Sequence, residues 1–192
     1  MYKRQIPILA VALHFLLSNL LYFLVERLVL DVFHIPPQQF MKYSYWGEIL
    51  IYAVLILVFF TLYKLLWRKE ISEPRTMTNF KDVLGSLVVG FGICGISGLW
   101  IMLAEQLPSL QKSVEAMNAG AENIAGGNAF GTFMIAVIAA PVVEEILFRG
   151  IVLRSMRKFA PAWASILISS VLFGVYHLNI VQAVYALSLI HI

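Results

Sequence analysis

Three long, mainly apolar runs dominate the first half of the chain and restrict what it can fold into. They cover 6–25, 47–66 and 84–104. A helix needs about 20 apolar residues to cross the hydrocarbon core of a bilayer. A helix also satisfies its backbone hydrogen bonds internally, which an open strand in lipid cannot do. The runs therefore predict three membrane-spanning helices.

The second half of the chain continues this pattern in shorter pieces. A fourth run begins near Phe130, a fifth covers 162–178, and a sixth, 180–189, is too short to cross a bilayer as a helix. The chain is 60% hydrophobic and 13% charged, with a mean hydropathy of +0.83. In soluble domains about a quarter of the residues are charged. The sequence predicts an all-α polytopic membrane protein, a bundle of about five complete transmembrane helices plus the start of a sixth.

The segments between the runs carry helix breakers and small residues. Pro36 and Pro37 predict a non-helical connection over 26–46. A short interfacial helix is expected over 109–121. In the third run, glycines on one side of the predicted helix would allow a neighbouring helix to approach closely; these are Gly92, Gly95 and Gly98.

Lysine and arginine residues divide unevenly between the two sides of such a bundle. With the N-terminus inside, three basic residues fall outside and eleven inside. Because cytoplasmic loops carry the excess of positive charge, we predict a multi-pass plasma-membrane protein with a cytoplasmic N-terminus. The net charge of +3 is too modest to indicate a nucleic-acid partner. The three outside residues are Arg27, Lys42 and Lys112, and the eleven inside are Lys3, Arg4, Lys64, Arg68, Lys69, Arg75, Lys81, Arg149, Arg154, Arg157 and Lys158.

Two adjacent carboxylates and an arginine follow residues 130–143, which contain no charge. They are Glu144, Glu145 and Arg149. Ionisable groups inside a membrane are costly and are usually functional. On a helix, Glu145 and Arg149 are four residues apart and can pair, whereas Glu144 points about 100° away from that face. The spacing therefore predicts one carboxylate tied to the arginine and the other left for chemistry.

This Glu-Glu-x-x-x-Arg segment, followed downstream by Phe173-x-x-x-His177, resembles the membrane-embedded CAAX-protease and bacteriocin-processing family. The eukaryotic members of that family include the type II CAAX prenyl endopeptidase. The resemblance implies an intramembrane endopeptidase in which Glu144 is the base that activates a water and His177 holds the same water. It further implies that Arg149 supports the site, that Glu145 is accessory and that Phe173 packs against the motif.

The need for a metal stays open at this stage. A glutamate in a low-dielectric pocket can serve as a general base, and a neutral imidazole can orient water, act as an acid or bind a metal. The spacing is not His-Glu-x-x-His and supplies no pair of ligands on one helical turn. If a divalent ion such as zinc takes part, Glu144 and His177 are the expected ligands. The expected partners are a peptide or protein substrate and the lipid bilayer, and the sequence gives no oligomeric state.

The resemblance implies two parts of the chain with a boundary at residue 129. Residues 1–129 hold the first three spans with their loops, and 130–192 hold a CAAX-protease-like core with two motifs. The family carries a third motif, His-x-x-x-Asn, on a later span, and only fifteen residues follow His177 here. His191 is not followed by the asparagine, so we do not assign it to this motif. We expect a C-terminally truncated member, possessing half of its site.

Two other functions fit the same features. Similar bacterial proteins are linked to bacteriocin maturation or self-immunity, so the chain is also compatible with a non-catalytic membrane immunity factor or a partner-binding scaffold. A small transporter would use charges in the membrane to line a path. Transporters commonly show inverted repeats and interrupted helices, and the sequence shows neither. The protease is the leading hypothesis, with the scaffold as its alternative.

Overall fold

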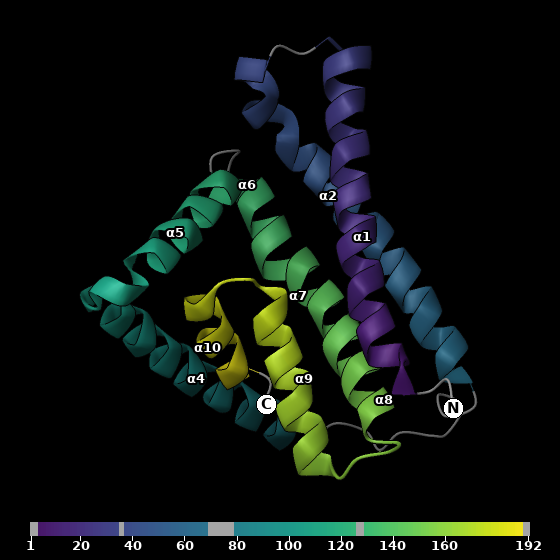
Figure 1. Cartoon of the computed structure of the whole chain (residues 1–192), viewed down its shortest axis with the longest axis vertical. Coiled ribbons are helices and arrows are strands. Elements are labelled where there is room, and N and C mark those ends of the chain that lie inside the picture. The colour runs from purple at the N-terminus through teal and green to yellow at the C-terminus, as the bar shows by residue number, and fades with distance from the viewer. Residues whose placement is uncertain (1–3, 35–36, 69–78, 126–128, 190–192) are drawn as a thin grey trace. The chain divides into compact units, whose positions relative to one another are not determined.

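The computed structural model describes residues 4–34, 37–68, 79–125 and 129–189, and every element within them is helical (Figure 1). The elements labelled η are π-helical, except η3, which is a 3-10 helix. In chain order the elements are α1 (Ile6–Arg27), η2 (Leu28–Val32), α2 (Pro37–Leu66), α4 (Phe80–Gln106), η3 (Pro108–Leu110), α5 (Gln111–Ala125), α6 (Ala129–Thr132), η4 (Phe133–Ala139), α7 (Ala140–Glu144), η5 (Glu145–Leu153), α8 (Arg154–Met156), α9 (Ala162–Tyr176) and α10 (Ile180–Leu189).

Three helical stretches are long and apolar enough to cross a membrane by length and composition. They are Ile6–Val32, Tyr45–Leu66 and Val83–Gln106. The prediction of an all-helical chain with three spans in its first half is confirmed at this level. Helix α9 is apolar but has 15 residues, fewer than the roughly 20 that a straight span requires. The count of about five complete spans therefore stays a prediction.

The predicted connection over 26–46 is mostly helical, which corrects the expectation. Helix α1 continues through η2 to Val32, and α2 begins at Pro37. Proline is tolerated in the first turn of a helix because the first backbone N–H groups have no acceptor within the helix. Pro37 therefore begins the second helix and does not interrupt it. The short helix expected over 109–121 is found as α5, shifted by a few residues.

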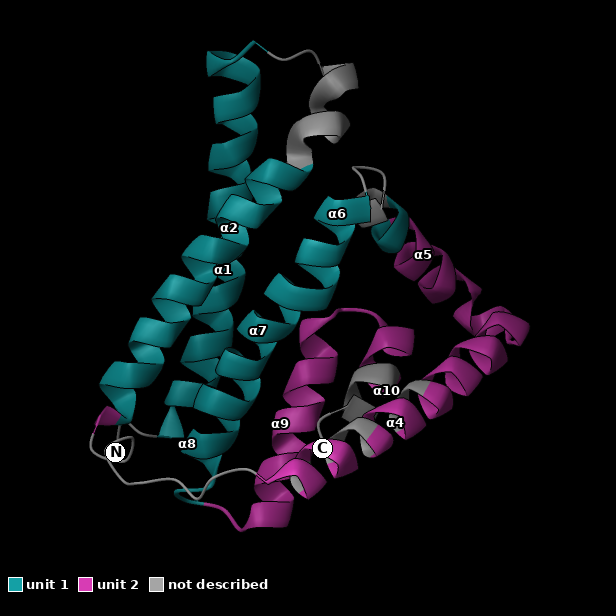
Figure 2. Ribbon diagram, turned by 180° about the vertical axis from the view of Figure 1, so that it is seen from behind, with its two compact units in different colours: residues 1–67, 120–159 teal, residues 68–119, 160–192 magenta. Residues whose placement is uncertain are grey.

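The chain forms two compact units, each built from two stretches of sequence (Figure 2). Unit 1 contains Met1–Trp67 and Gly120–Phe159, and unit 2 contains Arg68–Ala119 and Ala160–Ile192. The division at residue 129, which the resemblance implies, concerns function and stays a prediction.

Unit 1 is organised around the helical stretch 129–156, which we call the motif helix because it carries Glu144, Glu145 and Arg149. Helices α1 and α2 both pack against it. Helix α2 contacts the motif helix near both of its ends. The ring of Tyr45 lies against Gly131 and the ring of Tyr63 against Gly150, where each ring fills the space that a side chain on the glycine would need. Both helices contribute buried apolar side chains to the core of unit 1; they include Ile51, Leu55, Phe59, Ile135, Leu147 and Ile151.

The motif helix changes its winding around the glutamates. Pro141, in the first turn of α7, lacks a backbone N–H, and its ring crowds the preceding turn. The segments on either side of α7, η4 and η5, are wound as π-helices. Such π-turns inside longer helices occur frequently at functional sites. The sequence predicted a continuous helix here but not its altered winding.

Unit 2 contains a hairpin of α9 and α10, and α10 also packs on α4 (Figure 1). The hairpin is tight at Gly174, where a Cβ would lie 3.1 Å from Ala183 Cβ and 3.3 Å from Ala183 O. Trp100 of α4 donates from Nε1 to the carbonyl of Val181 at 3.0 Å. The packing around this bond buries Ala104, Val114 and Val181.

The glycine face predicted for close packing on α4 has no such neighbour among the described residues. A Cβ on Gly92, Gly95 or Gly98 would meet no described atom within 4 Å. That prediction is wrong for this part of the chain. Close approaches occur instead at glycines of other helices, namely Gly47, Gly131, Gly150 and Gly174.

Candidate active site

The predicted pairing of Glu145 with Arg149 is confirmed. Arg149 Nη1 donates to Glu145 Oε1 at 2.9 Å, one turn along the motif helix. Glu144 is the last residue of α7, directly before this pair, and its side chain is half-buried. Because consecutive helical residues point about 100° apart, Glu144 lies on a different face from the ion pair.

Helix α2 carries two polar side chains that the sequence did not single out, Glu48 and Tyr52, and one of them interacts with Glu144. Helix α2 packs on α7, and Tyr52 of α2 interacts electrostatically with both Glu144 and Glu48. All three side chains are half-buried. The sequence could have indicated Glu48, since it is the only acidic residue in the apolar span Tyr45–Leu66. An acid within a membrane span indicates a functional site by default.

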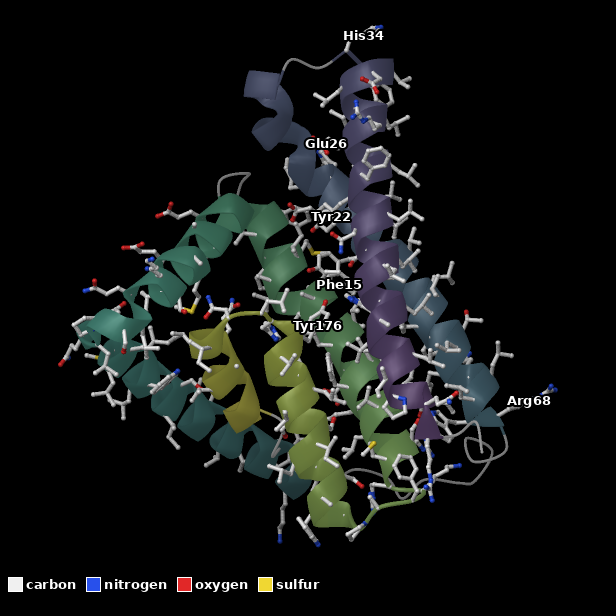
Figure 3. All side chains as sticks on the ribbon, viewed as in Figure 1. Phe15, Tyr22, Glu26, His34, Arg68 and Tyr176 are labelled. Atoms are coloured by element: carbon white, nitrogen blue, oxygen red, sulfur yellow. The ribbon has the colours of Figure 1, made fainter. Side chains whose placement is uncertain are left out.

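His177 ends α9 in unit 2, and its own helix orients its ring. His177 Nδ1 lies 2.9 Å from the carbonyl oxygen of Phe173. A carbonyl oxygen can only accept a hydrogen bond, so Nδ1 carries the proton and Nε2 is the basic nitrogen. The rings of Phe173 and Tyr176 meet the imidazole edge to face, at centroid distances of 4.7 and 5.4 Å. Figure 3 places Tyr176 at the end of α9.

The four-residue spacing of Phe173 and His177 thus has a local physical reason. Phe173 contributes its carbonyl oxygen to the imidazole and its ring to the side of the imidazole. Its side chain is buried, with 6% exposed. The predicted packing role of Phe173 agrees with this arrangement.

The chain reverses direction directly after His177. Leu178 adopts a left-handed backbone conformation with φ 52°, which is unfavourable for a branched side chain. Asn179 then caps α10, because its Oδ1 accepts from the N–H groups of Val181 and Gln182 at 2.9 and 3.2 Å. Its Nδ2 donates to the carbonyl of Ser113 at 2.7 Å. Strained backbone next to a polar side chain is common at functional sites.

The predicted site residues fall in both units. Glu144, Glu145 and Arg149 are together on the motif helix of unit 1, and His177 belongs to unit 2. The catalytic roles assigned to these four residues stay predictions. His191 lies outside the described residues.

The described residues do not form a complete set of metal ligands. Among them, no group of three or more His, Cys, Asp and Glu side chains is placed to hold a metal ion. Neither unit by itself therefore supplies three such ligands among its described residues, and no chemical step below is routed through a metal. The basic Nε2 of His177 is nevertheless of the type that zinc binds.

Comparison with known families supports the resemblance carried by the two motifs. Residues 126–192 match the family model of Rce1-like type II CAAX prenyl endopeptidases. The matched segment contains Glu144, Glu145, Arg149, Phe173 and His177. The chain has no match among curated proteins and none among solved structures. The family match and the long apolar helices indicate a membrane protein of which residues 126–192, about a third of the chain, are similar to CAAX endopeptidases.

Proposed function

We propose that the protein is an intramembrane endopeptidase that hydrolyses a peptide bond near the membrane surface. The observation that carries the proposal is the match of residues 126–192 to a CAAX endopeptidase family, since this segment includes both the glutamate motif and the histidine motif. In this proposal Glu144 is the general base and His177 holds the attacking water.

The chemistry follows from the properties of the two side chains. The Glu144 carboxylate takes a proton from the water, the resulting hydroxide attacks the carbonyl carbon of the substrate, and the protonated Glu144 returns the proton to the departing amine nitrogen. His177 can accept a hydrogen bond from the same water through Nε2, because Nδ1 is already committed to the carbonyl of Phe173. Glu145 and Arg149 balance each other's charge beside the base.

The setting of the reaction is part of the proposal. The substrate is a peptide or protein at the membrane, and the protein spans the plasma membrane several times with its N-terminus in the cytoplasm. Bacteriocin processing or self-immunity is the proposed biological context. If a divalent ion such as zinc takes part, Glu144 and His177 would hold it. Loss of activity on chelation with recovery by zinc would support the ion, whereas retained activity would assign water activation to the side chains alone.

Replacement of the proposed base tests the function. We expect Glu144→Gln to lower kcat by about 10²- to 10⁴-fold, the range that a general base contributes, because the amide keeps the shape of the side chain but cannot take a proton. The assay uses the full chain in proteoliposomes with a mixed library of internally quenched peptides. Glu105→Gln, a change at an exposed position of α4, is the matched control and should leave cleavage unchanged.

The alternative function, a non-catalytic immunity factor or partner-binding scaffold, predicts a different outcome. A scaffold should retain its partner or its immunity phenotype in the Glu144→Gln variant, since the shape and hydrogen bonding of the side chain are preserved. Cleavage by the wild type that persists unchanged in Glu144→Gln would remove Glu144 from the mechanism. Absence of any cleavage, with immunity retained in both proteins, would favour the scaffold.

A further inference from the structure

Three tyrosines on α2 share one face of the helix. Tyr52 follows Tyr45 by seven residues and precedes Tyr63 by eleven. At about 100° per residue, these spacings bring all three side chains to within about 20° of the same direction. A contact made by the first and third tyrosines therefore also gives the direction of the middle one.

Both outer tyrosines contact the motif helix. A Cβ on Gly131 would lie 2.9 Å from Tyr45 Cδ2, and a Cβ on Gly150 would lie 3.2 Å from Tyr63 Cδ2. The hydroxyl of Tyr63 also accepts a hydrogen bond from Arg154 Nη1 at 2.9 Å. Tyr52 thus faces the motif helix between residues 131 and 150, the stretch that contains Glu144.

The charges around Tyr52 agree with this placement. Tyr52 interacts electrostatically with Glu144 on the motif helix and with Glu48, which precedes it by one turn on α2. A phenol carries one O–H donor, and a carboxylate is a strong acceptor for it. Two carboxylates from different helices therefore act electrostatically on one tyrosine within unit 1.

We propose that Tyr52 is a positioning residue for Glu144: its hydroxyl donates a hydrogen bond to the Glu144 carboxylate. This hydrogen bond fixes the direction of the carboxylate before it reacts. This inference rests on the proposed function for its catalytic consequence, but the hydrogen bond itself can be tested without any activity.

Infrared spectroscopy tests the hydrogen bond directly. In the full chain labelled with ¹³C-glutamate, the carboxyl bands of Glu144 are those that Glu144→Gln removes. Tyr52→Phe deletes only the hydroxyl, and we expect it to shift these bands, whereas Tyr22→Phe should leave them in place. Tyr22 is an exposed tyrosine of α1 and serves as the matched control (Figure 3). Unchanged Glu144 bands in Tyr52→Phe would overturn the proposal, whether or not the protein cleaves peptides.

Kinetics then test the positioning role. We expect Tyr52→Phe to lower kcat by about 10- to 100-fold, the range for residues that orient a reacting group, with KM nearly unchanged. If Tyr52 had only a structural role, Tyr52→Phe would lower the yield of folded protein, and kcat per folded molecule would stay unchanged. If Glu144→Gln abolishes cleavage while Tyr52→Phe leaves kcat at the wild-type value, the proposed function stands and the positioning role fails. Failure of the function itself would show as absence of any cleavage by the wild type, an outcome that leaves the infrared test of the hydrogen bond unaffected.

Discussion

His177 and Glu144 differ in the sequence separation between each side chain and the residues that it contacts. The imidazole of His177 bonds to the carbonyl of Phe173, four residues earlier, and packs against the same phenylalanine ring. Glu144 interacts electrostatically with Tyr52, which is 92 positions earlier in the sequence. The surroundings of His177, which we call the local half, are therefore built within one helix, whereas those of Glu144, the distant half, depend on the packing of another helix.

This difference shows why the short family match contains the proposed reactive side chains but not all of the residues that surround them. Residues 126–192 include Phe173 and His177, so the local half is complete within the matched segment. They do not include α2, which contributes Tyr52 and Glu48 and packs along the motif helix. The N-terminal helices thus contribute to the environment of the proposed base as well as spanning the membrane.

The largest expected effect on stability comes from disrupting the local half at Gly174. We expect Gly174→Val to lower the free energy of unfolding by about 1–3 kcal/mol, because the new side chain would overlap Ala183, including its backbone oxygen. The measurement is thermal or denaturant-induced unfolding in mild detergent, followed by circular dichroism.

Gly98→Val is the matched control for this change. It is also a helical glycine of unit 2, and a Cβ at this position would meet no described atom within 4 Å. It therefore carries the same change in helix propensity without the overlap. Equal losses of stability in Gly98→Val and Gly174→Val would show that the α9–α10 contact is not tight.

The sequence predicted those features that depend on local spacing. The three apolar runs became α1, α2 and α4, and the four-residue spacing of Glu145 and Arg149 became an ion pair. These features follow from helix length and helix periodicity, both of which can be read within one segment.

Features that depend on which helices meet could not be predicted in the same way. Glycine spacing on α4 suggested a close contact, whereas the close contacts are at Gly131 and Gly174, where the partners come from other segments. The side chain of Trp67, which directly follows the apolar run 47–66, is buried, with 3% exposed. Tyr52 was missed because its importance depends on the register of α2 against the motif helix.

A smaller effect is expected from Trp67, which holds α2 against the motif helix and thus belongs to the distant half. Its indole Nε1 donates to the carbonyl of Gly150 on the motif helix at 3.0 Å. We expect Trp67→Phe to lower the free energy of unfolding by about 1 kcal/mol, the usual net value of such a hydrogen bond. Trp163→Phe is the control, because Trp163 is 71% exposed. Comparable losses in the two variants would mean that the Trp67 hydrogen bond does not hold α2 in place.

The smallest expected effect concerns the pair of Glu145 and Arg149, whose side chains are 56% and 36% exposed. Pairs four residues apart on an exposed helix contribute about 0.3–0.5 kcal/mol, and we expect this coupling from a double-mutant cycle of Glu145→Gln and Arg149→Met. The unfolding of all four proteins is measured in the same detergent. A coupling of several kcal/mol would contradict this expectation, because only a pair removed from water interacts so strongly. The pair would then be shielded from water, and the contrast between an exposed ion pair and the half-buried Glu144 would no longer hold.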